Sequence, residues 1–218
     1  MYKKKNPKKP VPVQVHEMVY RRLLVLLRAK FDPEPKNFES LLRRLLKGLH
    51  FPDLYAFYEE GEPARQAAFI SSGLAYRHYW HYTRGKVVTD IFSPGEIVLN
   101  PDAFFNGLRA DTGLEFIAGS TILIVSAEDM DLLMQQAKGT EMLTIKTLAA
   151  MFARGRPKDE LFRLAGKKRV ERFFELYPVL LCPARKAPMS YHDMASYLNL
   201  DPSHFSALVK ALYPDLDP

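Results

Sequence analysis

Side chains able to contact nucleic acid gather near the C-terminus, around a predicted helix that begins at Pro202. Hydroxyl, imidazole and ammonium groups hydrogen-bond to base edges and to phosphate oxygens, and a methyl group makes apolar contact with thymine. The candidate contact residues are Ser203, His204, Ser206, Ala207, Lys210 and His192. Serine reads bases permissively, and arginine, the usual reader of guanine, is missing from this set. The residues therefore predict phosphate contact with little sequence readout.

Apolar spacing around this helix predicts a helix-turn-helix. Counted from Tyr191, the positions that must be apolar for two such helices to pack carry Met194, Leu198, Leu200, Phe205 and Leu208. Ala195 falls where a small side chain is required, and Asn199 falls at the turn, where left-handed geometry favours glycine or asparagine. Asp201 and Pro202 are a typical cap and first helical residue. In such motifs the second helix enters the major groove of duplex DNA, whereas a plain helical hairpin would satisfy the apolar positions alone.

Groups of residues typical of an enzyme or of a metal site are missing. No Ser-His-Asp set, Cys-His pair or glycine-rich phosphate loop occurs in a strand-turn-helix setting, so we expect no catalytic residue and no cofactor. His78 and His81 lie three apart on a predicted strand, hence on opposite faces, which argues against a shared metal. The aromatic segment 76–82 is interpreted as alternating core and surface positions, with rings lining an internal pocket as the alternative. The single cysteine, Cys182, excludes a disulfide framework and is expected to be buried.

The middle of the chain consists of short runs rich in Val, Ile, Tyr, Phe and Thr, separated by glycine-bearing turns. Such regular spacing predicts a β-sandwich or barrel. The predicted strands are Leu54–Tyr58, Ala67–Ser72, Leu74–Thr83, Lys86–Phe92, Glu96–Leu99, Gly113–Ala118 and Thr121–Val125.

Helical patterns flank these strands. An amphipathic helix is expected over His16–Lys30, and Asn37 is expected to cap a second helix that continues to Leu49. A short helix over Asp129–Gln136 follows the strands.

The next helix carries an apolar stripe at three- and four-residue spacing. The stripe consists of Met142, Ile145, Leu148 and Phe152. Gly155-Arg156-Pro157 is expected to kink or break this helix, because proline cannot complete the hydrogen-bond ladder. Helix is then expected to continue over Lys158–Tyr177.

Three segments carry a family resemblance. Tyr58–Gly73 (YEEGEPARQAAFISSG), Arg84-Gly85-Lys86 and Ser93-Pro94-Gly95-Glu96 resemble the cyclic-nucleotide-binding barrel of the Crp/Fnr family, and Phe174–Pro178 resembles its compact C-terminal variants. The resemblance covers about residues 50–215. It implies an α+β chain: N-terminal helices, a double-stranded β-helix (jelly-roll) sensor barrel, a long dimerisation helix and a C-terminal all-α helix-turn-helix domain. It also implies a homodimeric transcription regulator that binds two-fold duplex DNA under the control of a small-molecule effector.

The phosphate cassette implied by this resemblance is degenerate. Leu99 and Asn100 replace the family's ribose-binding Gly-Glu pair, and Ala110 and Asp111 replace its phosphate-binding Arg-Ser or Arg-Thr pair. A carboxylate repels a buried phosphate, and losing the arginine removes a bidentate contact. We therefore expect an effector other than a cyclic nucleotide, although a one-residue loop shift would restore Arg109.

Composition fits such a protein. The net charge of +6 suits a phosphate-rich partner, but five of the lysines lie within the first ten residues, a pattern typical of a solvated tail. No apolar run approaches the roughly 20 residues of a membrane helix and no secretory signal is recognised, so a cytoplasmic location is expected. The predicted domains are a basic disordered tail (1–13), a helical cap with barrel (14–136), a dimerisation and linker helix (137–165) and a helix-turn-helix DNA-binding domain (166–218). The alternative is a ligand-sensing or protein-interaction module whose helix-turn-helix no longer reads DNA.

Overall fold

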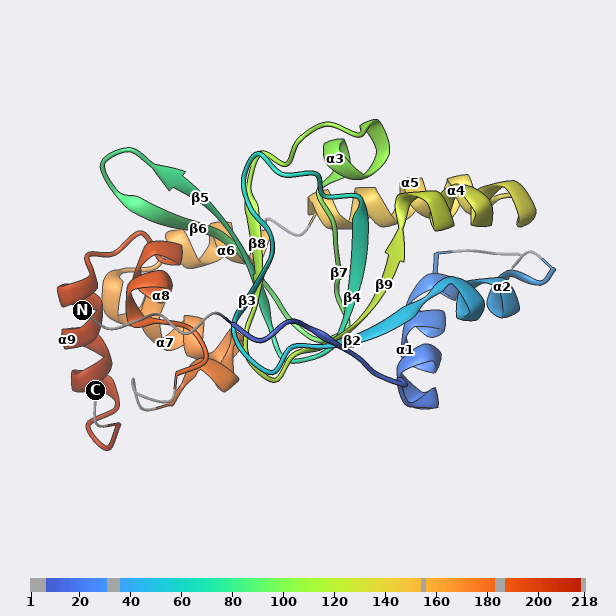
Figure 1. Ribbon diagram of the computed structural model, residues 1–218. Coiled ribbons are helices and arrows are strands. Elements are labelled where there is room, and N and C mark those ends of the chain that lie inside the picture. Colours follow the sequence, from blue (N-terminus) through green and yellow to red (C-terminus); the bar gives the residue numbers. More distant parts are fainter. Residues whose placement is uncertain (1–6, 31–35, 154–155, 183–186, 217–218) are drawn as a thin grey trace. The chain divides into compact units, whose positions relative to one another are not determined.

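A computed structural model of the protein describes residues 7–30, 36–153, 156–182 and 187–216 (Figure 1). The chain forms two compact units: the sheet unit, residues 1–75 and 92–152, and the C-terminal unit, residues 76–91 and 153–218. A hairpin from the middle of the sequence thus belongs to the C-terminal unit. These units follow contacts in space, so the predicted domain boundaries along the chain stay a prediction.

Antiparallel strands form the framework of the sheet unit. The order across its main sheet is β1 (Val11–Pro12), β2 (Lys47–His50), β9 (Thr121–Ser126), β4 (Gln66–Ser72) and β7 (Ile97–Val98). Ile122 of the central strand β9 pairs with Leu49 on one side and with Ile70 on the other. A second antiparallel pair joins β3 (Tyr55–Tyr58) to β8 (Gly113–Phe116). The predicted combination of helices and antiparallel strands is confirmed.

The two faces of the main sheet pack against different clusters. Ile122 and Ile124 belong to a cluster with Phe51 and Phe116, whereas Leu123 belongs to a cluster with the leucines of α1 (Glu17–Arg28) and α2 (Phe38–Leu45). Successive residues of a strand point to opposite faces, so a strand covered on both sides is continuously apolar. Each such buried side chain stabilises the fold by roughly 1.5–3 kcal/mol.

The second N-terminal helix is shorter than predicted. The expectation of helix to Leu49 is wrong, because α2 ends earlier and the chain continues as β2. Leu46 has extended backbone angles, and Gly48 pairs with Leu123 of β9. Pairing with the central strand therefore overrides the local helical pattern.

Three further local features differ from the sequence-based expectations. Asn37 precedes α2 with a left-handed φ of 66° and makes no side-chain cap hydrogen bond. Strand β1 lies within the segment 1–13 that was predicted as a tail, since it pairs with β2. A helix that was not predicted, α3 (Pro101–Asn106), follows β7.

The predicted strands are all present, and each end lies within two residues of its expected position. The two remaining strands, β5 (Ala75–His81) and β6 (Gly85–Phe92), form the hairpin whose residues 76–91 join the C-terminal unit. Gly85 ends the hairpin turn with φ of 72°, a left-handed conformation that glycine adopts readily.

The helices after the sheet are interrupted. Helix α4 (Ala127–Gln136) starts two residues earlier than predicted because the Ser126 hydroxyl accepts a hydrogen bond from the Asp129 N–H at 3.0 Å. The predicted break is confirmed, since α5 (Thr140–Phe152) ends and α6 (Arg156–Phe162) begins around it. Gly155 itself lies outside the described residues.

The expected continuous helix over Lys158–Tyr177 is wrong. Helix α6 ends at Phe162, and α7 (Gly166–Leu176) begins after the extended residue Ala165. The predicted dimerisation segment 137–165 therefore contains two separate helices.

The C-terminal unit continues with a short 3₁₀ turn (Pro178–Leu180) and the helices α8 (Tyr191–Tyr197) and α9 (Pro202–Leu212). Phe173 and Phe174 of α7 are buried beneath them. Cys182 is partly exposed instead of fully buried, and desolvation raises the pKa of its thiol. Among the helices of the described residues, none combines the length and apolar character needed to span a membrane.

Candidate functional site

Helices α8 and α9 pack closely, as their apolar spacing predicts. Their buried contact residues are Met194, Ala195, Leu198, Phe205 and Val209. Ala195 has no exposed surface, so a larger side chain there would push the helices apart. Leu200 and Leu208, also predicted as apolar contacts, are partly buried.

The turn between these helices has the predicted backbone geometry. Asn199 adopts the left-handed conformation with φ of 51°, which is unfavourable for most side chains. The Leu200 N–H donates to the Ala195 carbonyl at 2.9 Å and closes the turn. The chain therefore leaves α8 and enters α9 in a defined direction.

Both helices start at side-chain caps. The Ser190 hydroxyl accepts a hydrogen bond from the Asp193 N–H at 3.0 Å. One carboxylate oxygen of Asp201 accepts from the N–H groups of Ser203 at 2.9 Å and His204 at 3.1 Å, and a proline follows as the first helical residue. The predicted cap is confirmed, and it satisfies amide groups that have no partner within the helix.

Arg169 of α7 links α7 to the end of α8 and to the α6–α7 connection through hydrogen bonds. Its Nη1 donates to the Leu198 carbonyl at the end of α8 at 3.0 Å, and its Nη2 donates to the Leu164 carbonyl between α6 and α7 at 3.0 Å. No local sequence pattern indicates this role of Arg169, because the contact joins parts of the chain 29 positions apart.

The predicted contact residues share an accessible surface. Ser203, His204 and Ala207 near the start of α9, Lys210 further along it and His192 on α8 are all exposed. Ser206 is partly buried and donates its hydroxyl to the Pro202 carbonyl at 2.9 Å. Lys186 and Arg185, which the sequence also offers as phosphate contacts, lie outside the described residues.

A groove adjoins the start of α9. It has a volume of about 360 Å³ and is lined by the hairpin residues Arg84, Lys86 and Val87 and by residues of the α8–α9 segment, among them His192, Ser196 and Asp201. Arg84 is exposed, whereas Lys86 donates to the Tyr76 hydroxyl at 3.1 Å. Two basic side chains distant in sequence are thus brought next to the predicted contact helix. The motif Arg84-Gly85-Lys86 was noted for its family resemblance, and nothing in its local pattern indicated this position.

The hairpin is fixed to α8 through the outer edge of β6, a strand that pairs with β5. The Ser196 hydroxyl accepts from the Val88 N–H at 3.1 Å and donates to the Lys86 carbonyl at 3.2 Å. An edge strand exposes unpaired backbone groups, and this hydroxyl satisfies two of them.

Lys158 of α6 makes a further contact with this edge. Its ammonium donates to the Thr89 carbonyl and lies 4.8 Å from the ring centroid of Tyr197. Burial lowers the pKa of the Lys158 ammonium, and Asp90 and Asp159 partly oppose that change. Hairpin and helices therefore form one unit through polar side chains.

In the aromatic segment at this hairpin, Tyr76 and His78 are buried, while Trp80 is 62% and Tyr82 93% exposed. The expected alternation of core and surface positions is not observed, because these four residues occupy every second position and burial instead decreases along the segment.

The cassette residues make hydrogen bonds within their own segment and to a neighbouring loop. Asn100 caps α3 and donates its amide to the Asp111 carboxylate at 2.7 Å. Arg109 is exposed and donates to the Gly61 carbonyl at 2.7 Å. Ala110 is buried, so neither it nor Asp111 offers a cation to a phosphate.

Aromatic rings occupy the space between the strands of the sheet unit. Phe51 stacks on Phe116 with centroids 4.6 Å apart, and Phe57 meets Phe116 edge-on at 5.3 Å. Both Phe51 and Phe116 have no exposed surface. These rings fill the interior with apolar groups.

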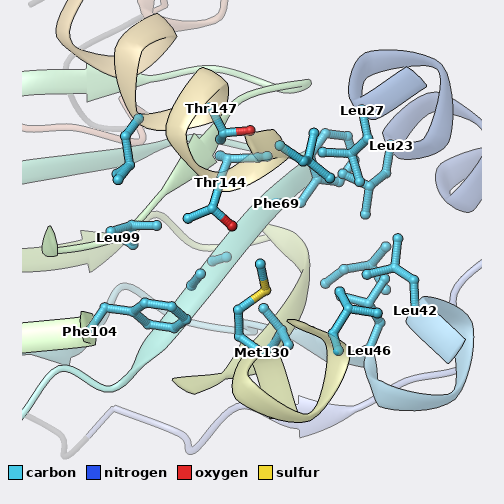
Figure 2. A pocket seen from close by; sticks show the side chains of 18 of the residues that line it. Leu23, Leu27, Leu42, Leu46, Phe69, Leu99, Phe104, Met130, Thr144 and Thr147 are labelled. Atoms are coloured by element: carbon cyan, nitrogen blue, oxygen red, sulfur yellow. The ribbon is translucent and has the colours of Figure 1, made fainter. Parts of the chain in front are cut away.

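A separate apolar cavity lies on the helical face of the main sheet (Figure 2). It has a volume of about 100 Å³ and is lined by side chains from α1, α2, α3, α4, α5 and the sheet. Leu99 of the cassette contributes to its wall, as does Leu148 of the predicted dimerisation stripe. The residues of the stripe therefore have different surroundings. Met142 and Ile145 are 52% and 57% exposed, whereas Leu148 lines the cavity. The side chain of Phe152 lies outside the described part of the chain.

Solved structures of other proteins share this fold over most of the chain. A regulator from Eubacterium rectale assigned to the Crp/Fnr family aligns with a TM-score of 0.62 and 12% identity, over 83% of this chain and 84% of that one. The chain has the fold of the Crp/Fnr regulators. The c-di-GMP-responsive global regulator CLP of Xanthomonas campestris aligns with a TM-score of 0.58 and 15% identity, over 82% and 92% of the two chains. A cyclic nucleotide-binding domain from Methylobacillus flagellatus aligns with a TM-score of 0.59 and 14% identity, over 72% and 90%.

No protein-family model and no curated protein matches the sequence, so the likeness to Crp/Fnr regulators is supported by the comparison of structures.

Proposed function

We propose that this chain is a Crp/Fnr-like transcription regulator, not an enzyme, that binds duplex DNA as a homodimer in the cytoplasm. The observation that carries the proposal is the α8–α9 segment, where the left-handed Asn199 and the Asp201 cap set the second helix with its polar face exposed. The left-handed turn and the cap support a helix-turn-helix, a motif in which the second helix enters the major groove. The fold shared with Crp/Fnr regulators supports the same conclusion.

In this proposal α9 supplies the contacts to DNA. Ser203, His204 and Ala207 face the base edges, and Lys210 and His192 contact phosphates. Arg84 of the hairpin adds a cation beside the start of α9. Because serine and alanine discriminate weakly between bases, phosphate contacts provide most of the affinity and make it strongly dependent on salt.

The homodimer forms through α5. Met142 and Ile145, three residues apart, expose large apolar side chains on one face of this helix. Paired across a two-fold axis, such faces bury each other, and the two α9 helices then address half-sites about one helical turn of DNA apart.

The sheet unit is the sensor, and its strands form the jelly-roll implied by the fold. The cassette is poorly suited to a cyclic phosphate, because Arg109 is exposed and donates to the Gly61 carbonyl while the acidic residue Asp111 lies beside Asn100. The effector is therefore a molecule other than a cyclic nucleotide.

A second candidate function is a protein-interaction module that no longer reads DNA. The exposed aromatic residues Trp80 and Tyr82 on the hairpin favour it, since exposed aromatic side chains are typical of protein interfaces.

Selection of genomic DNA fragments by the purified protein, at about 50 mM and about 200 mM salt, decides between the two functions. Enrichment of a two-fold-symmetric sequence supports the regulator and gives the half-site spacing. Salt-sensitive binding without enrichment, or no binding, supports the interaction module.

A further inference from the structure

The apolar cavity of the sheet unit has the features of a ligand site separate from the phosphate cassette. Its walls are aliphatic and aromatic side chains, including Leu23 and Leu27 of α1, Leu42 of α2, Phe69 of β4 and Phe104 of α3. No charged residue is among its lining residues. A charged molecule would lose its hydration there without finding a counter-ion, so only an uncharged occupant fits.

The polar groups of the wall are two hydroxyls on α5. Figure 2 shows Thr144 and Thr147 between the leucines of α1 on one side and Leu99 with Phe104 on the other. The two threonines differ in their bonding. Thr144 donates to the Thr140 carbonyl one turn earlier at 3.0 Å, as helical threonines often do.

The Thr147 hydroxyl has no such bond. Its oxygen is buried and has no hydrogen-bond partner among the described residues. Buried polar groups are nearly always paired, so an unpaired hydroxyl in an apolar wall indicates a missing partner. A hydrogen-bonding atom of a molecule inside the cavity would supply it.

We propose that this cavity binds a small, uncharged, mostly aliphatic or aromatic molecule through one oxygen that hydrogen-bonds to Thr147. The volume of about 100 Å³ limits the occupant to about six heavy atoms, because a dry apolar cavity of about 150 Å³ accommodates benzene. Apolar contact supplies the affinity, and the hydroxyl selects molecules that carry the oxygen.

The cavity is placed to act on the proposed dimer. Leu143, Thr147 and Leu148 form the inner face of α5 along the cavity, while Met142 and Ile145 are exposed on its outer face. An occupant that packs against the inner face favours one position of α5 and thereby changes dimerisation. This regulatory part rests on the proposed homodimer, whereas the binding itself does not.

Cyclopentanol and cyclopentane form a matched pair of probes, since they differ by one hydroxyl. The full chain, with methyl-labelled leucine and methionine, is titrated with each probe and followed by NMR. We expect saturable shifts of the Met130 methyl and of the leucine methyls that line the cavity. Thr147→Val is expected to weaken the binding of cyclopentanol about five-fold, which corresponds to the loss of one hydrogen bond. The affinity for cyclopentane should change less than about two-fold.

Two variants serve as controls. Thr147→Ser retains a hydroxyl, so its affinity for cyclopentanol should lie within about two-fold of that of the native chain. Thr144→Val removes a hydroxyl that already has a partner, so its affinity for cyclopentanol should also lie within about two-fold of the native value. Methyl spectra establish that each variant is folded. The binding proposal is overturned if neither probe gives saturable shifts at these methyls, or if Thr147→Val and Thr144→Val weaken cyclopentanol equally.

Sedimentation equilibrium tests the regulatory part. Cyclopentanol at a concentration that half-saturates the native chain should change the dimer dissociation constant of that chain, and should change that of Thr147→Val less, because the variant binds the probe about five-fold more weakly. An unchanged constant for the native chain contradicts the coupling. Neither experiment contains DNA, so failure of ligand binding and failure of DNA binding are separate results.

Discussion

The hydroxyl of Ser196 accepts a hydrogen bond from the backbone N–H of Val88 at 3.1 Å, although the two residues are 108 positions apart. The same hydroxyl donates to the carbonyl of Lys86, so one side chain of α8 holds two backbone groups at the edge of the hairpin. This contact explains why residues 76–91 belong to the C-terminal unit.

Ser196→Ala should therefore loosen the hairpin. The Val88 N–H and the Lys86 carbonyl lose a partner in a partly buried position, which costs about 1–3 kcal/mol of unfolding free energy. Urea denaturation measures the loss, and faster hydrogen exchange in peptides covering 85–92 locates it. Ser206→Ala is the control, because its hydroxyl lies at an outer position of α9 and bonds one helical carbonyl. Equal exchange in the two variants would contradict the role of Ser196.

The turn of the α8–α9 segment should depend on Asn199. Asn199→Ala forces a side chain with no local hydrogen-bonding capacity into φ of 51°, so we expect a loss of about 1 kcal/mol in unfolding free energy. Asn199→Gly should stay within about 0.5 kcal/mol of the native chain, because glycine adopts this conformation without a Cβ penalty. Guanidinium denaturation of the three chains is the measurement. A larger loss for glycine than for alanine would show that the asparagine side chain, and not the backbone angle, matters.

Stability should depend on the charge of Lys158 at alkaline pH. Burial lowers the pKa of its ammonium in the folded state below the ordinary lysine value of 10.5. Between the lowered folded pKa and 10.5 the unfolded chain binds more protons at this site than the folded chain, so the stability contributed here rises with pH. Below the folded pKa the lysine is charged in both states and its contribution is constant.

Lys158→Met retains the apolar stem and removes the titration. The unfolding free energy of the native chain minus that of Lys158→Met should increase as pH rises toward 10.5. Urea denaturation at neutral pH and at several alkaline values provides the difference, which cancels the titration of other groups. A difference that falls with pH would mean that the charged ammonium is favoured in the folded protein.

Thr147→Val should stabilise the free protein. Valine has the shape of threonine and removes a buried hydroxyl that has no partner, which should raise the unfolding free energy by about 1 kcal/mol. Thr144→Val removes a hydroxyl bonded to the Thr140 carbonyl and should give no such gain. Thermal unfolding of both variants without ligand is the measurement, and equal effects would mean that the two hydroxyls have similar surroundings.

Features that depend on neighbouring residues could be predicted from the sequence. The cap at Asp201, the left-handed Asn199 and the break after α5 each follow from the chemistry of one or two residues. Strand positions followed from glycine turns and β-branched runs for the same reason.

Features set by distant contacts could not be predicted. The segment 47–50 has a helical pattern but becomes β2, because the central strand β9 supplies its hydrogen bonds. Arg84 lies at the site because α8 holds the hairpin, and the cavity needs side chains from eight helices and strands. Single positions such as Thr147 carry no sequence signal, since a threonine in a helix looks the same whether or not its hydroxyl has a partner.

Binding of a selected DNA duplex as a function of salt tests the central proposal most directly. The native chain, Lys210→Ala on α9 and Lys47→Ala on β2 of the sheet unit are compared, both lysines being exposed. We predict that Lys210→Ala weakens binding and reduces the slope of log affinity against log salt by about 1, the loss of one phosphate contact, while Lys47→Ala leaves both unchanged. Salt slopes that are equal in all three chains, or the absence of any salt-dependent binding, would contradict the assignment of α9 as the DNA-contacting helix.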